Sequence, residues 1–145
     1  MPNEHDGKWD PATVIGLNQF DEILVIGNPA FMPWLSDVCR DISSVRKPGE
    51  LTTLIKEGEQ FDKIILPRES TFSPDLVPLV AALLKNSDTE RGMFVVFPSG
   101  DGWTESAGVD LYFQEGRSWE LDTTFGQVQL FELAPTSWRM IHGKV

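Results

Sequence analysis

The chain has 145 residues, a formal net charge of −10 and a hydrophobic content of 41%. This length and composition predict one soluble globular domain without a transmembrane helix, and residues 1–10 are too polar for a secretory signal, so we expect a cytoplasmic protein. The acidic charge excludes nucleic acid as an expected partner, because affinity for duplexes depends largely on Lys and Arg contacts with phosphates. It is typical of a soluble protein and also suits a basic protein partner.

The N-terminal segment and the first strand have different compositions. Residues 1–18 are polar and contain several turn-forming residues, so we expect an N-terminal arm followed by a single domain of residues 19–145. Residues 22–26 form a short, β-branched apolar run, which is typical of a parallel strand covered on both faces. The turn residues Gly27, Asn28 and Pro29 end this strand.

Two helices and a second strand are predicted next. Pro33 suits the first turn of a helix, residues 42–45 form a short strand, and a second helix extends from Pro48 to a stop near Gly58. Cys39 falls in the first of these helices, where we expect a buried thiol. As the sole cysteine, it excludes an intramolecular disulfide and a thiolate metal cluster.

The alternation of strand and helix continues. Residues 61–66 predict a strand, a helix follows from residues 73–75 to about Asn86, and residues 93–97 predict another strand.

The C-terminal segments 109–114, 118–122 and 127–133 are strand-like and are separated by tight turns, which indicates an antiparallel meander. The predicted class is therefore α/β: a mostly parallel, Rossmann-like open sheet with helices on both faces and this meander at its C-terminal end.

This order of elements resembles a shortened class I S-adenosylmethionine-dependent methyltransferase domain. Residues 22–27 match the family's first strand and glycine loop, and Phe61-Asp62 matches the Phe-Asp start of a later strand. Residues 83–96 resemble its passage of leucine and lysine, then glycine, then a strand, and residues 127–135 resemble its last strand. The resemblance implies a Rossmann-like fold and a cofactor site at the carboxyl ends of the strands.

The same resemblance exposes departures at that site. The family's first loop offers several glycines to the methionine carboxylate, whereas here Gly27 and Asn28 are followed by Pro29, which has no N–H. The family's acidic, ribose-binding residue after the second strand is missing, and Ser44 stands near its place. One strand–helix unit is also missing. We therefore expect a pseudoenzyme that binds no cofactor and serves as a protein interaction or assembly module.

Two alternatives stay open. A small active methyltransferase of unknown substrate would hold S-adenosylmethionine near Gly27, Asn28 and Ser44, with Glu69 as a candidate base. An anion- or nucleotide-binding α/β protein is a third class.

Loop residues supply the candidate interaction surface. Trp103 and Arg68 are the candidates: tryptophan is enriched at binding hot spots and Arg68 could hold an anion, although ordinary loop roles also explain them. An unpaired sheet edge is compatible with a homodimer. His5 and His142 lie near opposite ends of the chain, so no metal site is expected, and neither a nucleophile elbow nor a phosphate-binding loop motif occurs.

Overall fold

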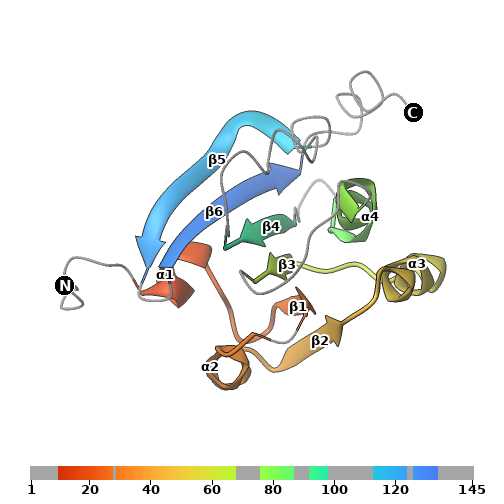
Figure 1. The fold of residues 1–145 in the computed structure, drawn as a ribbon, viewed down its shortest axis with the longest axis horizontal. Helices are drawn as coiled ribbons and strands as arrows, with labels where there is room; N and C mark the ends of the chain where they lie inside the picture. The colour runs from red at the N-terminus through yellow and green to blue at the C-terminus, as the bar shows by residue number, and fades with distance from the viewer. Residues whose placement is uncertain are drawn as a thin grey trace.

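In the part of the chain that the structure describes, six strands form one sheet, in the order β2-β1-β3-β4-β6-β5 (Figure 1). The computed structural model describes residues 10–27, 29–67, 76–86, 92–97, 113–123 and 126–133. Its strands are β1 (Glu22–Ile26), β2 (Asp41–Val45), β3 (Lys63–Leu66), β4 (Met93–Val96), β5 (Phe113–Thr123) and β6 (Gly126–Leu133). The first four are parallel to one another, whereas β6 is antiparallel to both β4 and β5.

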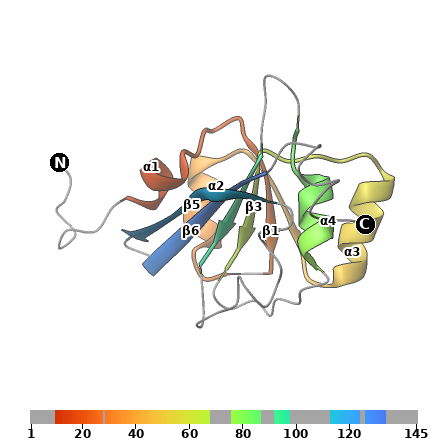
Figure 2. The same ribbon diagram turned by 90° about the horizontal axis from the view of Figure 1, so that it is seen from above.

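Helices cover both faces of the sheet. In the described residues they are α1 (Pro11–Ile15), α2 (Met32–Val38), α3 (Pro48–Lys56) and α4 (Leu76–Leu83). Figures 1 and 2 show α1 and α2 on one face and α3 and α4 on the other. None of these helices is long and apolar enough to cross a membrane. The predicted Rossmann-like α/β class is thus confirmed.

The burial of β1 explains its apolar sequence. β1 lies between β2 and β3, and Ile23, Leu24 and Val25 are each 0% exposed. Successive side chains of a strand point to opposite faces, so Leu24 packs under α3 and α4 while Ile23 and Val25 pack on the α1 and α2 side. A strand covered in this way needs apolar residues at every position.

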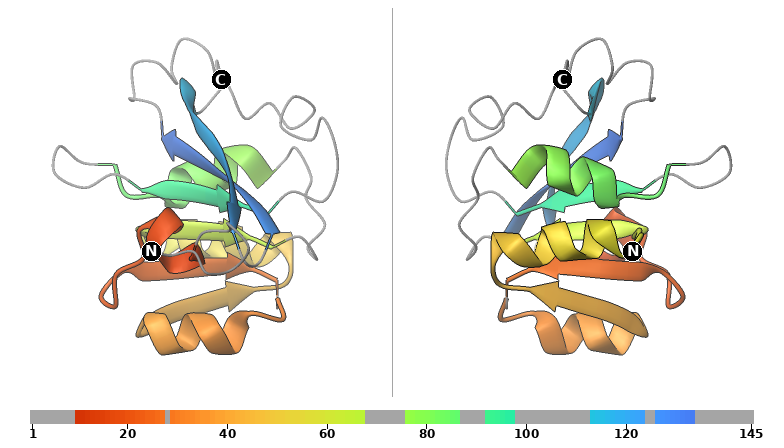
Figure 3. Two further views of the ribbon diagram at one scale, coloured as in Figure 1. Left: turned by 90° about the vertical axis from the view of Figure 1, so that its left-hand side faces the viewer. Right: turned by 90° about the vertical axis from the view of Figure 1, so that its right-hand side faces the viewer.

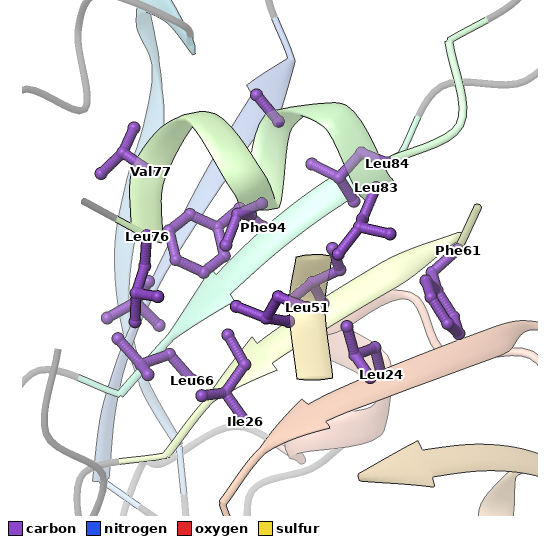
Figure 4. Close-up of a cluster of buried hydrophobic side chains, with 14 of the residues drawn as sticks. Leu24, Ile26, Leu51, Phe61, Leu66, Leu76, Val77, Leu83, Leu84 and Phe94 are labelled. Carbon is purple, nitrogen blue, oxygen red and sulfur yellow. The ribbon is translucent and has the colours of Figure 1, made fainter. Parts of the chain in front are cut away.

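The larger core cluster fills the space between the sheet and helices α3 and α4. Phe94 of β4 is fully buried beneath α4, and Figure 4 shows its ring beside Leu76. Leu51 brings α3 into the same cluster. Further buried members are Ile26, Val45, Phe61, Ile64, Leu66, Val80, Leu83, Leu84, Val96 and Phe131. Both helices are therefore held by apolar packing against the sheet.

Two predicted helix ends were wrong. Cys39 is the residue after α2 and has extended backbone (φ −121°, ψ 145°), although its thiol is buried as expected. Helix α4 ends at Leu83 instead of Asn86. The reason is that Leu84 pairs with Phe61 in a parallel β-bridge, and the Phe61 N–H donates to the carbonyl oxygen of Leu83 at 2.8 Å.

The predicted meander is a hairpin in the described residues. The segments expected at 109–114 and 118–122 belong to one strand, β5, as far as they are described. Its register against β6 shifts between Phe113 and Ser118, and such an irregularity bends a long strand. Residues 109–112 and the helix start predicted at 73–75 lie outside the described residues.

Candidate functional site

The carboxyl ends of β1 and β3 mark the topological switch point of this sheet. From β1 the chain runs to α2 on one face, and from β3 it continues to α4 on the opposite face (Figure 1). In open α/β sheets, ligands bind outside the strand ends at such a point. The residues that follow these strands therefore form the candidate site.

Gly27, the first candidate cofactor residue, uses its amide within the sheet. Its N–H donates to the carbonyl oxygen of Val45 at 2.8 Å, which adds one hydrogen bond to the β1–β2 pairing. Its φ of 116° is a backbone conformation that L side chains rarely adopt, which explains why glycine stands here. The main-chain donor that the resemblance assigns to the methionine carboxylate is thus already bound.

Prolines follow both strands at the switch point. Pro29, after β1, and Pro67, directly after β3, are buried, and neither has an N–H to offer. The carbonyl oxygen of Pro29 accepts the Met32 N–H at 3.1 Å, so this turn leads directly into α2. Asn28 lies outside the described residues. At the described positions that directly follow β1 and β3, the Gly27 N–H is therefore already bound, and Pro29 and Pro67 have no N–H to donate to an anionic ligand.

Aromatic side chains lie at the same edge of the sheet. The rings of Phe31, before α2, and Phe97, after β4, are 5.2 Å apart between centroids. Phe31 also meets Trp34 edge-on at 6.3 Å, and Phe97 is 5% exposed. These rings pack against the core cluster that contains Val25. Apolar packing, rather than a set of polar groups, thus characterises this part of the carboxyl edge.

Ser44 does not end its strand. It is the penultimate residue of β2, opposite Val25 of β1, and its side chain is exposed. Val45 ends the strand and accepts the hydrogen bond from Gly27. The structure therefore brings Gly27 to Val45 and leaves Ser44 on the outer strand of the sheet.

Glu50 is a site residue that the sequence argument missed. Its Oε1 accepts the backbone N–H of Arg46 at 2.6 Å and that of Lys47 at 3.1 Å. These two hydrogen bonds lower the pKa of the Glu50 carboxyl below its usual range. The amides that follow β2 thus bind a carboxylate of the chain itself. A glutamate two residues after the proline that begins α3 was the signal, since glutamate is favoured in a first helical turn.

The remaining candidates Arg68, Glu69 and Trp103 lie outside the described residues. Their roles stay predictions.

At the opposite edge, where β1 and β3 begin, charged side chains bind one another. The Asp62 Oδ2 accepts the Glu22 N–H at 2.8 Å and lies 3.3 Å from Lys85 Nζ. Lys85 Nζ also lies 3.1 Å from Glu22 Oε1, and Lys63 Nζ lies 3.0 Å from Asp21 Oδ2. Among the described residues, no group of three or more His, Cys, Asp or Glu could hold a metal ion.

These partners change the pKa of the Lys85 ammonium group. Burial acts to lower its pKa, but the hydrogen bonds and charges of Glu22 and Asp62 outweigh burial, so its pKa is raised. This lysine joins the end of α4 to the starts of β1 and β3.

Phe61-Asp62 and the passage around Lys85 and Gly92 carry much of the methyltransferase resemblance, and both lie at this amino edge. The Lys85 N–H donates to the Phe61 carbonyl oxygen at 3.0 Å, and the Gly92 N–H donates to the Lys85 carbonyl oxygen at 2.7 Å. A Cβ added at Gly92 would lie 2.7 Å from two side-chain atoms of Leu84, which explains the glycine. These motifs therefore hold the fold together, at the edge away from the switch point.

Comparison with known proteins adds a distant structural likeness. No protein-family model matches the chain, and no curated protein matches its sequence. Among solved structures, the fibrillarin pre-rRNA processing protein of Methanococcus jannaschii is similar, with a TM-score of 0.40 and 15% identity. The likeness covers 81% of this chain and 67% of that chain.

Proposed function

We propose that this chain is a methyltransferase-like domain that does not bind S-adenosylmethionine and that acts as a protein interaction module. The bound amide of Gly27 at the switch point is the observation that carries the proposal. The buried prolines Pro29 and Pro67 support it, since they supply no N–H at neighbouring positions.

The energy of the missing contacts supports the same view. A hydrogen bond to a charged ligand group contributes about 1.5–3 kcal/mol. Losing two such bonds weakens binding by about a hundredfold or more, because about 1.4 kcal/mol corresponds to a factor of ten. Freeing the Gly27 amide for a carboxylate would also break its bond to Val45, which adds to the cost.

Calorimetry tests the proposal. The chain is titrated with S-adenosylmethionine and with S-adenosylhomocysteine, and the expected result is no heat of binding at millimolar ligand. Dissociation constants in the micromolar range for either compound would contradict it. The unfolding temperature measured beforehand shows that the sample is folded, and its rise on adding nucleotides would assign the chain to the nucleotide-binding class instead.

An active methyltransferase is the second candidate. The positive φ of Gly27 favours it, because a tight turn at the end of the first strand is also what lets a backbone approach a ligand. This alternative predicts the micromolar binding described above, together with methyl transfer from the labelled cofactor to a protein or small-molecule acceptor.

The partner in the proposed function is a protein. The formal net charge of −10 favours a basic partner for the surface as a whole. Arg68 and Trp103 stay the proposed contact residues of the loops. Substituting both by alanine is expected to weaken capture of that partner without lowering the unfolding temperature.

A further inference from the structure

Strand β2 has one neighbour in the described sheet. It pairs with β1 over its full length, and the sheet order places it at the end opposite the β5–β6 pair (Figures 1 and 3). An edge strand presents backbone N–H and C=O groups on its outer side, which can pair with another chain. Its sequence between Asp41 and Val45 contains neither proline nor lysine, two residues that commonly block such pairing.

The direction of one hydrogen bond shows which residues face outward. Val45 points its carbonyl toward β1, where it accepts the Gly27 N–H. The N–H and C=O of one residue in a strand point to the same side, and successive residues alternate. Ser43 therefore also faces β1, whereas the backbone groups of Ile42 and Ser44 face outward.

Hydrogen bonds within the chain limit this outer row at both ends. The Arg40 N–H donates to the Gln19 carbonyl oxygen at 3.1 Å, and the Arg46 N–H donates to Glu50 Oε1 at 2.6 Å. The backbone groups of Ile42 and Ser44 lie between these two bonds. The outward-facing backbone groups can therefore pair with a short extended segment.

Side chains around this row give it a positive charge. Residues 40–47 contain three cations, Arg40, Arg46 and Lys47, and one carboxylate, Asp41, in a chain whose net charge is −10. The Glu50 carboxylate, which accepts the Arg46 and Lys47 amides, is a second negative charge here, so three cations and two carboxylates leave a local charge of +1. All five of these residues are exposed. The local charge is thus opposite in sign to that of the chain, and it favours an acidic segment over a basic one.

An exposed aromatic ring lies at one end of the row. Phe20 is 68% exposed, and the Arg40 guanidinium lies 5.3 Å from the centroid of its ring. Such a cation–π pair presents an apolar surface and a fixed charge together, a combination found at binding hot spots. We define the β2 edge as Phe20, Arg40, Ile42, Ser44 and Arg46.

Charge makes a second copy of this chain a poor occupant. In the antiparallel pairing in which Ile42 of each copy exchanges hydrogen bonds with Ser44 of the other, Arg40 would stand opposite Arg46. Like charges in directly opposed positions destabilise paired strands, and each copy also carries the charge of −10.

We propose that the β2 edge binds an extended, acidic segment of a partner protein, which adds a strand to the sheet beside β2. This inference rests on the proposed interaction function only in requiring a protein partner. It does not depend on whether S-adenosylmethionine binds.

A synthetic peptide tests the proposal by fluorescence anisotropy. The probe alternates valine and threonine and has glutamates at both ends, and a second peptide has lysines in their place. The glutamate peptide is expected to bind at least about tenfold more tightly than the lysine peptide, a difference of about 1.4 kcal/mol. Failure of the glutamate peptide to bind, or equal binding of the two, would overturn the proposal.

Two variants separate backbone pairing from charge. Ser44→Pro removes an outward-facing backbone N–H, a loss that an edge strand tolerates. It should raise the dissociation constant of the glutamate peptide by about tenfold. Arg46→Glu should weaken it as well, whereas Lys56→Glu, an exposed cation on α3, should leave it unchanged. Equal losses in Arg46→Glu and Lys56→Glu would reduce the effect to net charge and overturn the proposal.

Amide NMR keeps the test independent of these variants. On the unmodified chain, the glutamate peptide should shift the amide signals of Ile42 and Ser44 more than that of Ser43. Shifts elsewhere with none at Ile42 and Ser44 would contradict strand addition here.

Sedimentation velocity tests whether two copies of the chain pair through this edge. A dimer that Ser44→Pro converts to a monomer would assign the edge to a second copy.

The two proposals fail separately. Micromolar binding of S-adenosylmethionine with intact peptide binding overturns the loss of cofactor binding alone. If S-adenosylmethionine gives no heat of binding and the glutamate peptide also fails to bind, only the proposal of strand addition at β2 is overturned.

Discussion

The amino edge of the sheet, where β1 and β3 begin, and the carboxyl edge, where they end, differ in chemistry. Asp62, Lys85 and Glu22 bind one another at the amino edge, whereas buried Pro29 and Pro67 follow the same strands at the carboxyl edge. Ligand-binding sheets of this type place their ligand groups at the carboxyl ends. In this chain, the polar interactions retained around β1 and β3 are those that hold the fold.

A resemblance to a family can reflect a shared fold or a shared function. The Phe61-Asp62 and Lys85-to-Gly92 motifs lie at the amino edge and make contacts within the chain. These contacts stabilise the fold and involve no residue of the carboxyl edge. Resemblance in these motifs therefore indicates fold, and function depends on the carboxyl edge.

The largest expected effect comes from removing aromatic packing at the carboxyl edge. Phe97→Ala should lower the free energy of unfolding by about 4 kcal/mol, because it truncates a ring that is 5% exposed and packs on Phe31. Urea unfolding measures the loss, and Phe20→Ala, at a ring that is 68% exposed, is the matched control with a change of about 0.5 kcal/mol. A loss below about 1 kcal/mol in Phe97→Ala would show that this edge is not packed as described.

A glycine substitution tests the amino edge next. Gly92→Ala should cost about 3 kcal/mol, because its Cβ would approach Leu84 side-chain atoms to 2.7 Å and the Lys85 backbone nitrogen to 3.0 Å. Gly49→Ala, in α3 with nothing within 4 Å, is the control and should stabilise the chain by about 0.5 kcal/mol. Chemical denaturation of both variants gives the comparison, and equal effects would count against close packing at Gly92.

Removing the shared carboxylate at the amino edge should have a smaller effect. Asp62→Ala leaves the Glu22 N–H and the Lys85 ammonium group without this acceptor, at a cost of about 2 kcal/mol. Asp62→Asn keeps an acceptor oxygen and should cost about half as much. Thermal unfolding of Asp41→Ala, at an exposed carboxylate of β2, provides the reference, and a shift as large as that of Asp62→Ala would refute a special role for Asp62.

The smallest effect is a dependence on alkaline pH. The pKa of Lys85 is raised in the folded chain, so its contribution to stability is complete below its unfolded pKa of about 10.4 and is lost as pH rises through the folded value. The free energy of unfolding, measured across this pH range, should fall more steeply with rising pH for the unmodified chain than for Lys85→Met. Lys56→Met, which removes an exposed lysine of α3, is the control for the loss of one positive charge. If the free energy of unfolding depends on pH equally in Lys85→Met and in the unmodified chain, the Lys85 ion pairs do not stabilise this edge.

Local patterns were sufficient to predict most elements of the sheet. The apolar runs of β1 and β3 and the glycine after α3 follow from burial on both faces and from a left-handed turn, with φ 76° at Gly58. The end of α4 was missed because a long-range bridge between Leu84 and Phe61 decides it. Propensity carries no information about a partner that lies more than twenty residues away in the sequence.

Only part of the candidate site could be predicted from the sequence. The proline after Gly27 showed that a donor was missing, because proline has no N–H in any fold. That Gly27 itself donates to Val45, and that Glu50 binds the amides after β2, required the strands to be placed side by side.

The apolar residues, the turns that need glycine and the positions without an amide can be identified from the sequence, since these are properties of single residues and their neighbours. The edge that holds the ion pairs, the outward-facing backbone groups of β2 and the donors that are already bound can be identified only from the folded chain. These features depend on strand order and register, and they arise only when segments distant in the chain meet.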